Sequence, residues 1–195
     1  MLESMMRRGR ARCPRGFTVI ELMTVVFVAA ILLAVAVPAM REFAIRQRLK
    51  AVNAELVTDL QYARSESIVR NQPIQVRFRI DDPDMTCYTI HTAGVAIGRC
   101  DCRKPIGTAC DDVAGLDELK TVQVLRSSNV TLAPPASPDN FVNFLEPKGL
   151  SNRNDFRVTV ASSTGGALRT STNTFGRPQV CSPGGTIGGV PTCAD

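Results

Sequence analysis

The longest apolar stretch of the chain lies near its N-terminus and contains a single charge. From Phe17 to Val37 only Glu21 is charged. At about 1.5 Å of rise per residue these positions make a helix of roughly 31 Å, the thickness of the hydrocarbon core of a bilayer. The five arginines of residues 1–16 outnumber their one acid, so the positive-inside bias keeps this segment in the cytoplasm. The pattern therefore predicts a membrane-spanning helix at 17–37 with the rest of the chain on the other side.

The helical pattern resumes after Pro38 in amphipathic form. Apolar residues recur at steps of three and four between positions 45 and 63, and charged residues fall mostly off this stripe. A proline inside a helix predicts a kink or local unwinding at Pro38. The residue before Pro73 is steered toward extended geometry, which places the helix end near Asn71. Residues 38–71 are thus expected to continue the helix and to pack on a globular domain.

From residue 74 onward the apolar residues alternate with period two. Short β-like runs are separated by clusters of turn residues, at 74–80, 85–91, 95–100, 121–126, 141–145, 156–162 and 167–174. A long helix followed by about seven short strands predicts an α+β fold, with an antiparallel sheet packed on the helix stripe. Residues 72–195 are expected to form this β domain and a C-terminal tail.

Charge and chemistry add little to this picture. The net charge is +5, but residues 1–16 contribute +4 of it (five arginines minus one glutamate), so the remainder of the chain carries only +1. This charge does not by itself indicate a nucleic-acid partner. The one histidine, His91, lies in a run expected to be a hairpin edge, with no nucleophile pair beside it, and is expected at the surface. We expect no enzyme activity and no cofactor.

Six of the seven cysteines follow the apolar run. They lie in the part of the chain that is expected outside the cytoplasm, where disulfides persist. Their even number favours a disulfide framework over a metal site built on Cys100, Cys102, Cys110 and His91. If residues 93 and 94 form a two-residue hairpin loop, Cys87 faces Cys100 at a distance that suits a disulfide.

Two further disulfides complete the expected framework. Cys102 would then pair with Cys110, and Cys181 with Cys193 would close the C-terminal tail. The Cys102–Cys110 pair depends on the assumed hairpin register. The connectivity among the four central cysteines therefore stays open.

The run Gly16-Phe17-Thr18-Val19-Ile20-Glu21-Leu22, with Pro38 beyond it, resembles the class III signal of type IV pilins and type II secretion pseudopilins. The resemblance implies that a prepilin peptidase cuts between Gly16 and Phe17 and methylates the new N-terminus, so that residues 1–16 are a cleaved leader. A carboxylate inside an apolar span costs a few kcal/mol and needs a partner. The family supplies one, since Glu21 would pair with the Phe17 ammonium of a neighbouring subunit during assembly. The alternative is a plain signal anchor whose Glu21 reaches the membrane interface.

Two further segments are similar to the GspH/FimT branch of this superfamily, residues 60–71 and residues 141–150, whereas the middle of the chain, 85–140, resembles it poorly. The resemblance implies a minor pilin that joins other pilins in a type IV pilus, in the assembly-priming or tip complex. The alternatives are a type II secretion minor pseudopilin of the H type and a DNA-binding minor pilin for DNA uptake. Either way the protein would sit in the inner membrane with a periplasmic C-terminal domain, and in a pilus it would later be extracellular.

The tail bears on the DNA-binding alternative. FimT-like DNA receptors carry a basic motif here with two arginines two residues apart, whereas this chain has Arg177 but Gln179. A single cation gives little electrostatic affinity for a polyanion. We therefore expect a structural tail, in which Gly176 allows a sharp turn and Arg177 anchors the tail to a carboxylate or a backbone carbonyl. A DNA contact by Arg177 is the alternative.

Overall fold

The computed structural model describes residues 16–93, 100–113, 115–136, 138 and 140–194. The chain divides into two compact units, Met1–Arg41 and Glu42–Asp195, which are described separately. The first contains the apolar part of one long helix. The second contains the rest of that helix and all of the strands.

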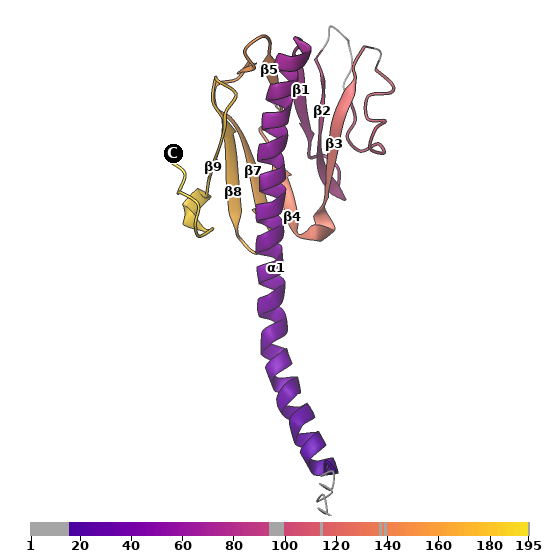
Figure 1. The fold of residues 1–195 in the computed structure, drawn as a ribbon, viewed down its shortest axis with the longest axis vertical. Helices are drawn as coiled ribbons and strands as arrows, with labels where there is room; N and C mark the ends of the chain where they lie inside the picture. Colours follow the sequence, from indigo (N-terminus) through magenta and orange to yellow (C-terminus); the bar gives the residue numbers. More distant parts are fainter. Residues whose placement is uncertain (1–15, 94–99, 114, 137, 139, 195) are drawn as a thin grey trace, which may run out of the picture. The chain divides into compact units, whose positions relative to one another are not determined.

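Helix α1 spans Val19–Arg70 (Figure 1). It ends where the sequence predicts, because Asn71 adopts a left-handed conformation with φ 50° and leads into Pro73. Pro38 lies inside the helix, which continues through it without interruption. Local unwinding at Pro38 is therefore excluded, and a bend there stays a prediction.

The second unit holds two antiparallel sheets, and the α+β prediction is confirmed. The first sheet has the order β3-β2-β1-β5-β6 and the second has the order β4-β7-β8-β9. The strands are β1 Ile74–Arg79, β2 Met85–Thr92, β3 Glu118–Leu125, β4 Val130–Ala133, β5 Phe141–Leu145, β6 Leu150–Ser151, β7 Phe156–Ser162, β8 Ala167–Thr172 and β9 Pro178–Cys181, with short 3-10 turns at Arg126–Ser128 and Pro183–Gly185. Sequence periodicity missed β4, β6 and β9, each of four residues or fewer.

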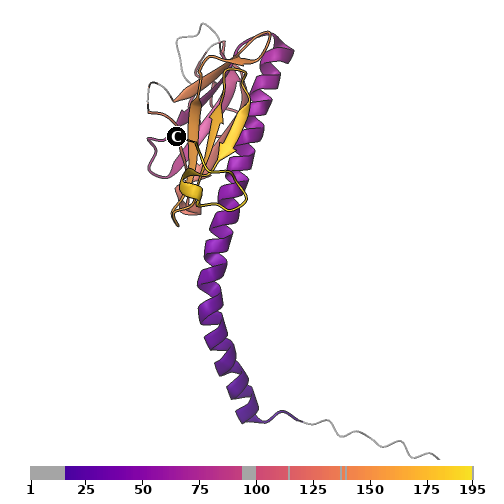
Figure 2. The same ribbon diagram turned by 90° about the vertical axis from the view of Figure 1, so that its left-hand side faces the viewer.

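The core lies between the C-terminal part of α1 and the two sheets. Figures 1 and 2 show this part of the helix lying along one side of the strands. The amphipathic stripe supplies Leu49, Leu56, Leu60 and Ala63, all almost fully buried. They pack in one cluster with apolar side chains from both sheets, among them Phe78, Tyr88, Val142, Phe144, Val158 and Val160. At about 25 cal/mol per Å² of apolar surface, this burial is the main source of stability.

One carboxylate of α1 is buried in this interface. Asp59 accepts a hydrogen bond from the Tyr88 hydroxyl (2.7 Å) and one from Lys120 Nζ (2.7 Å), and Lys120 also donates to Glu55 (3.2 Å). Burial and the Asp59 charge raise the pKa of Tyr88. Burial alone would lower the pKa of Lys120, but the hydrogen bonds to Asp59 and Glu55 outweigh it and raise that pKa. Asp59 thus ties the helix to β2 and β3.

The two central disulfides differ from the expected pairing. Cys87 bonds to Cys102 and Cys100 bonds to Cys110. The expected hairpin is wrong because both edges of β2 are occupied: Cys87 lies opposite Arg79 of β1 and Gln123 of β3. Of the strand expected at 95–100, residues 95–99 lie outside the described part, and Cys100 is in a loop.

His91 is buried, not exposed as expected. It lies on β2 between Gln75 of β1 and Glu118 of β3, and only 2% of its surface is accessible. Its Nδ1 is 2.9 Å from the carbonyl oxygen of Thr92. Burial lowers its pKa, so the ring is neutral at physiological pH. The sequence analysis expected a hairpin edge, whereas β2 is an inner strand of the sheet between β1 and β3.

Candidate functional site

The predicted cleavage point lies outside any regular structure and is accessible. Gly16, Phe17 and Thr18 precede α1, and Phe17 is 79% exposed. A Cβ built on Gly16 would meet no atom within 4 Å. The fold therefore does not require glycine at position 16.

The start of α1 is fixed by a side chain that the sequence analysis did not single out. Thr18 Oγ1 accepts a hydrogen bond from the backbone N–H of Glu21 (3.3 Å). Threonine followed three residues later by glutamate is the spacing of a capping box, in which the first side chain satisfies a free N–H of the first helical turn. The spacing of Thr18 and Glu21 could therefore have predicted this cap from the sequence. Thr18 thus caps the N-terminus of α1.

Glu21 lies in the first turn of α1. Within the described residues its carboxylate has no hydrogen bond and no ion pair, and the side chains beside it on the helix are apolar and exposed, including Ile20, Leu22, Val25 and Val28. A carboxylate in such surroundings is costly unless it is paired. The described residues supply no such partner for Glu21.

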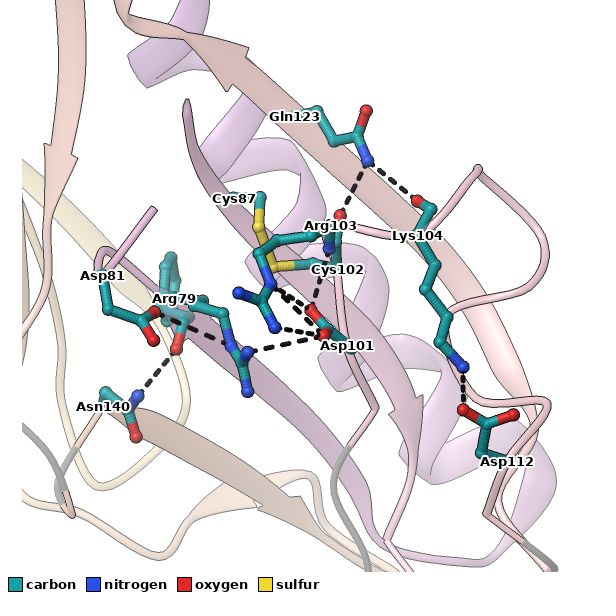
Figure 3. Close-up of polar contacts among 11 residues, drawn as sticks. Arg79, Asp81, Cys87, Asp101, Cys102, Arg103, Lys104, Asp112, Gln123 and Asn140 are labelled. Carbon is teal, nitrogen blue, oxygen red and sulfur yellow. Dashed lines mark hydrogen bonds and ion pairs between the residues drawn. A yellow bond between two sulfur atoms is a disulfide. The ribbon is translucent and has the colours of Figure 1, made fainter. Parts of the chain in front are cut away.

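Residues 100–113, between β2 and β3, are cross-linked by two disulfides, of which Figure 3 shows Cys87–Cys102, and by side-chain hydrogen bonds. The Gln123 amide donates to the carbonyl oxygens of Cys102 (2.7 Å) and Lys104 (2.9 Å). Asp101 accepts from Arg103 (2.7 Å) and pairs with Arg79 (3.4 Å), as Figure 3 shows. The hydrogen bonds from Arg103 lower the pKa of Asp101 to about 2.

All three cysteines of the described part of this loop are oxidised: Cys102 is bonded to Cys87 of β2, and Cys100 to Cys110. The described residues contain no group of three or more His, Cys, Asp or Glu that could hold a metal ion. We interpret the described part of the loop as a structural segment that disulfides and hydrogen bonds attach to β2 and β3.

The C-terminal tail is closed by a disulfide between Cys181 and Cys193. It begins at a sharp turn that needs glycine. Gly176 has φ 67° and a Cβ there would lie 2.5 Å from the carbonyl oxygen of Gly149. The turn is held by Asn173, whose side chain accepts from the backbone N–H groups of Phe175 and Arg177 (both 3.1 Å).

Arg177 does not anchor the tail as expected. Its guanidinium has no hydrogen bond or ion pair within the described part of the chain, and the anchoring is done by its backbone through Asn173. The side chain instead lines a cleft of about 430 Å³ with Gln61 and Arg64 of α1 and with Pro178. Arg64 Nε donates to the carbonyl oxygen of Gly149 (3.3 Å). Two arginines thus line one cleft.

Comparisons with known proteins agree with this geometry. Residues 53–178 match the family described as type II transport protein GspH, and residues 12–37 match the prokaryotic N-terminal methylation motif. Neither a curated protein nor a solved structure matches the chain significantly. Helix α1 is long and apolar enough to cross a membrane, and together with the motif it fits anchoring in the inner membrane. The motif implies processing by a prepilin peptidase and assembly with other pilins. Since the GspH model covers more than half of the chain, the protein belongs to the GspH family and is a minor pilin or pseudopilin.

Proposed function

We propose that this chain is a minor pilin that is incorporated into a type IV pilus, within the complex that primes assembly and lies near the tip. The observation that carries incorporation is Glu21, a carboxylate on an apolar helix with no partner in the described part of its own chain. Cleavage at the accessible Gly16–Phe17 bond creates a cation at the depth where Glu21 needs one. A neighbouring subunit can supply that cation, and the pair sets the axial register between subunits.

The preference for a pilus over a secretion system rests on the tail. Beyond β9 the chain continues as a disulfide-closed segment without a charged residue from Ser182 to Ala194. Such a rigid neutral loop suits contact with another minor pilin at the outer end of a filament. A periplasmic location before assembly and an extracellular location after it follow from this role.

Deletion of the chain from its native host tests the proposal. Surface pili should disappear while export of folded type II substrates continues. Mass spectrometry of sheared pili from the complemented strain should detect this chain beginning with N-methylated Phe17. Gly16→Val is the matched control. The fold has room for a Cβ at this position, so the variant should fold, but we expect the peptidase not to accept it. Loss of type II secretion with normal piliation would instead identify a pseudopilin of the H type.

A DNA-binding minor pilin is the second candidate, and the cleft between Arg64 and Arg177 favours it. The two guanidiniums could contact phosphates, although the cleft holds few charges for a polyanion. The test is titration of the protein with duplex DNA at low and physiological salt. Arg177→Ala should abolish any binding, whereas Arg157→Ala is the control because Arg157 pairs with Asp155 away from this cleft. Low-micromolar binding at physiological salt that depends on Arg177 would favour DNA uptake over our first proposal.

A further inference from the structure

A second, smaller cleft lies between α1 and the tail within the unit Glu42–Asp195. It has a volume of about 260 Å³ and is lined by Phe43, Arg46, Gln47 and Lys50 of the helix and by residues 186–188 of the tail. We call it the juxtamembrane cleft, because Phe43 comes six residues after Val37, the last residue of the apolar run. Its tail side is fixed in place, since Ile187 is buried in the main core and donates its backbone N–H to Ser182 Oγ (3.0 Å).

The cleft carries positive charge that the described chain does not neutralise. Lys50 has no ion pair there, and Arg46 reaches only Glu42, at 3.9 Å, with both side chains more than half exposed. An exposed pair at this distance contributes little. Residues 39–52 contain four cations and one acid, and the tail from Ser182 to Ala194 contains no charge.

The tail adds a hydrogen-bond donor to these cations. The backbone N–H of Gly188 has no partner among the described residues. Two cations and a free backbone N–H are the groups that hold a phosphate oxygen in proteins. The charge and the size of the cleft therefore suit a phosphate monoanion or diester.

The position along the helix indicates where this phosphate comes from. Side chains of a helix tilt toward its N-terminus, so those of Arg46 and Lys50 lean toward the N-terminal end of their own helical segment. Phe43, 60% exposed, is an apolar ring next to these cations. An exposed aromatic side chain with lysine and arginine just beyond a membrane span is typical of a segment at the headgroup level.

We propose that the juxtamembrane cleft binds the phosphate of an anionic phospholipid headgroup while the protein is anchored in the membrane, which rests on the proposed function only in placing the apolar run in a bilayer. Arg46 and Lys50 contact the phosphate, Gly188 donates its N–H, and Phe43 packs on the glycerol and the upper acyl chain. The lipid stays bound until the subunit leaves the bilayer for a filament.

The test uses the full chain in vesicles. The protein has no tryptophan, so Phe43→Trp gives one fluorophore at the cleft. Its quenching by brominated phosphatidylglycerol is compared with quenching by brominated phosphatidylcholine at equal mole fraction. We expect phosphatidylglycerol to be preferred about tenfold. The double variant R46Q/K50Q should lower this preference to near onefold, whereas R48Q should keep it. Arg48 is the matched control because it lies on the same segment but does not line the cleft.

Three outcomes would overturn the proposal. The first is equal quenching by the two lipids. The second is a preference that R48Q lowers as much as R46Q/K50Q, which would show diffuse attraction without a site. The third is soluble glycerol phosphate displacing the lipid at millimolar concentration, which would show a site for free phosphate. If R46Q/K50Q blocks filament assembly while no lipid is preferred, the cleft takes an acidic segment of another subunit. None of these results depends on whether the filament is a pilus.

Discussion

Two carboxylates on the same helix have opposite environments. Asp59 is buried and accepts hydrogen bonds from Tyr88 and Lys120, both of its own chain. Glu21 lies among exposed apolar side chains and has no partner within the described residues. Because a buried or membrane-embedded charge is stable only when it is paired, Asp59 contributes to folding, and under our proposal Glu21 serves assembly.

The apolar residues of α1 divide in the same way. Leu49, Leu56 and Leu60 are covered by the sheets, whereas large apolar side chains from Val19 to Val37 are about half exposed or more. The first group is buried by folding, whereas under our proposal the second is covered by lipid and later by other subunits. The helix thus joins a folding surface to an assembly surface, and substitutions on the two parts should affect different measurements.

The largest effect is expected from a core leucine. Leu56→Ala removes a fully buried side chain and should lower the free energy of unfolding by about 3 kcal/mol, since the cavity it leaves cannot be filled. Leu32→Ala, on the exposed apolar part, should change it by less than about 0.5 kcal/mol. Denaturant unfolding of the full chain in mild detergent measures both. Equal losses would contradict the division of the helix.

Glu21→Ala tests the assembly surface. We expect incorporation into filaments to fall about thirtyfold, or about 2 kcal/mol, because a neighbouring Phe17 ammonium loses its partner. The free energy of unfolding should stay unchanged. Quantitative immunoblotting of sheared filaments gives the first value and denaturant unfolding the second. Glu42→Ala, an exposed acid on the same helix, is the control and should assemble normally. Wild-type assembly by Glu21→Ala would exclude the pairing.

Tyr88→Phe tests the buried carboxylate. It removes only the hydroxyl that donates to Asp59 at 2.7 Å. The loss of a hydrogen bond to a buried charge should cost about 1.5 kcal/mol of folding stability. Assembly of the variant that still folds should be normal. A filament defect without a change in unfolding would show that Asp59 also serves assembly.

The helix was predictable from sequence because its signals are local. The 17–37 run, the stripe around Leu49 and Leu56 and the stop before Pro73 each follow from residues a few positions apart. The longer strands were found for the same reason. Strands β4 and β6 are too short to show a period of two, and β9 begins with Pro178, which lowers its strand signal.

The features that could not be predicted depend on contacts between residues that are distant in the sequence. The pairing of Cys87 is set by β3 occupying the edge of β2 that a hairpin would have used, and no local pattern places residue 123 beside residue 87. The burial of His91 and the cleft joining Arg64 to Arg177 have the same origin. Of the candidate assembly site, Gly16 and Phe17 were identified by resemblance and Glu21 as the one charge in the apolar run, whereas Thr18 could have been found from its spacing to Glu21.

The smallest expected effect concerns Thr18, which links the cleavage point to Glu21. Thr18→Val keeps the shape of the side chain but removes the hydroxyl that accepts from the Glu21 N–H. Loss of an N-terminal cap costs about 1 kcal/mol, so the first helical turn should fray and Glu21 should be less well placed for its partner. We expect filament incorporation to fall about fivefold while cleavage after Gly16 stays complete by mass spectrometry. Thr18→Ser retains the hydroxyl and should behave as wild type. If Thr18→Val and Thr18→Ser assemble equally well, the cap does not position Glu21, and the carboxylate finds its partner from a frayed helix end.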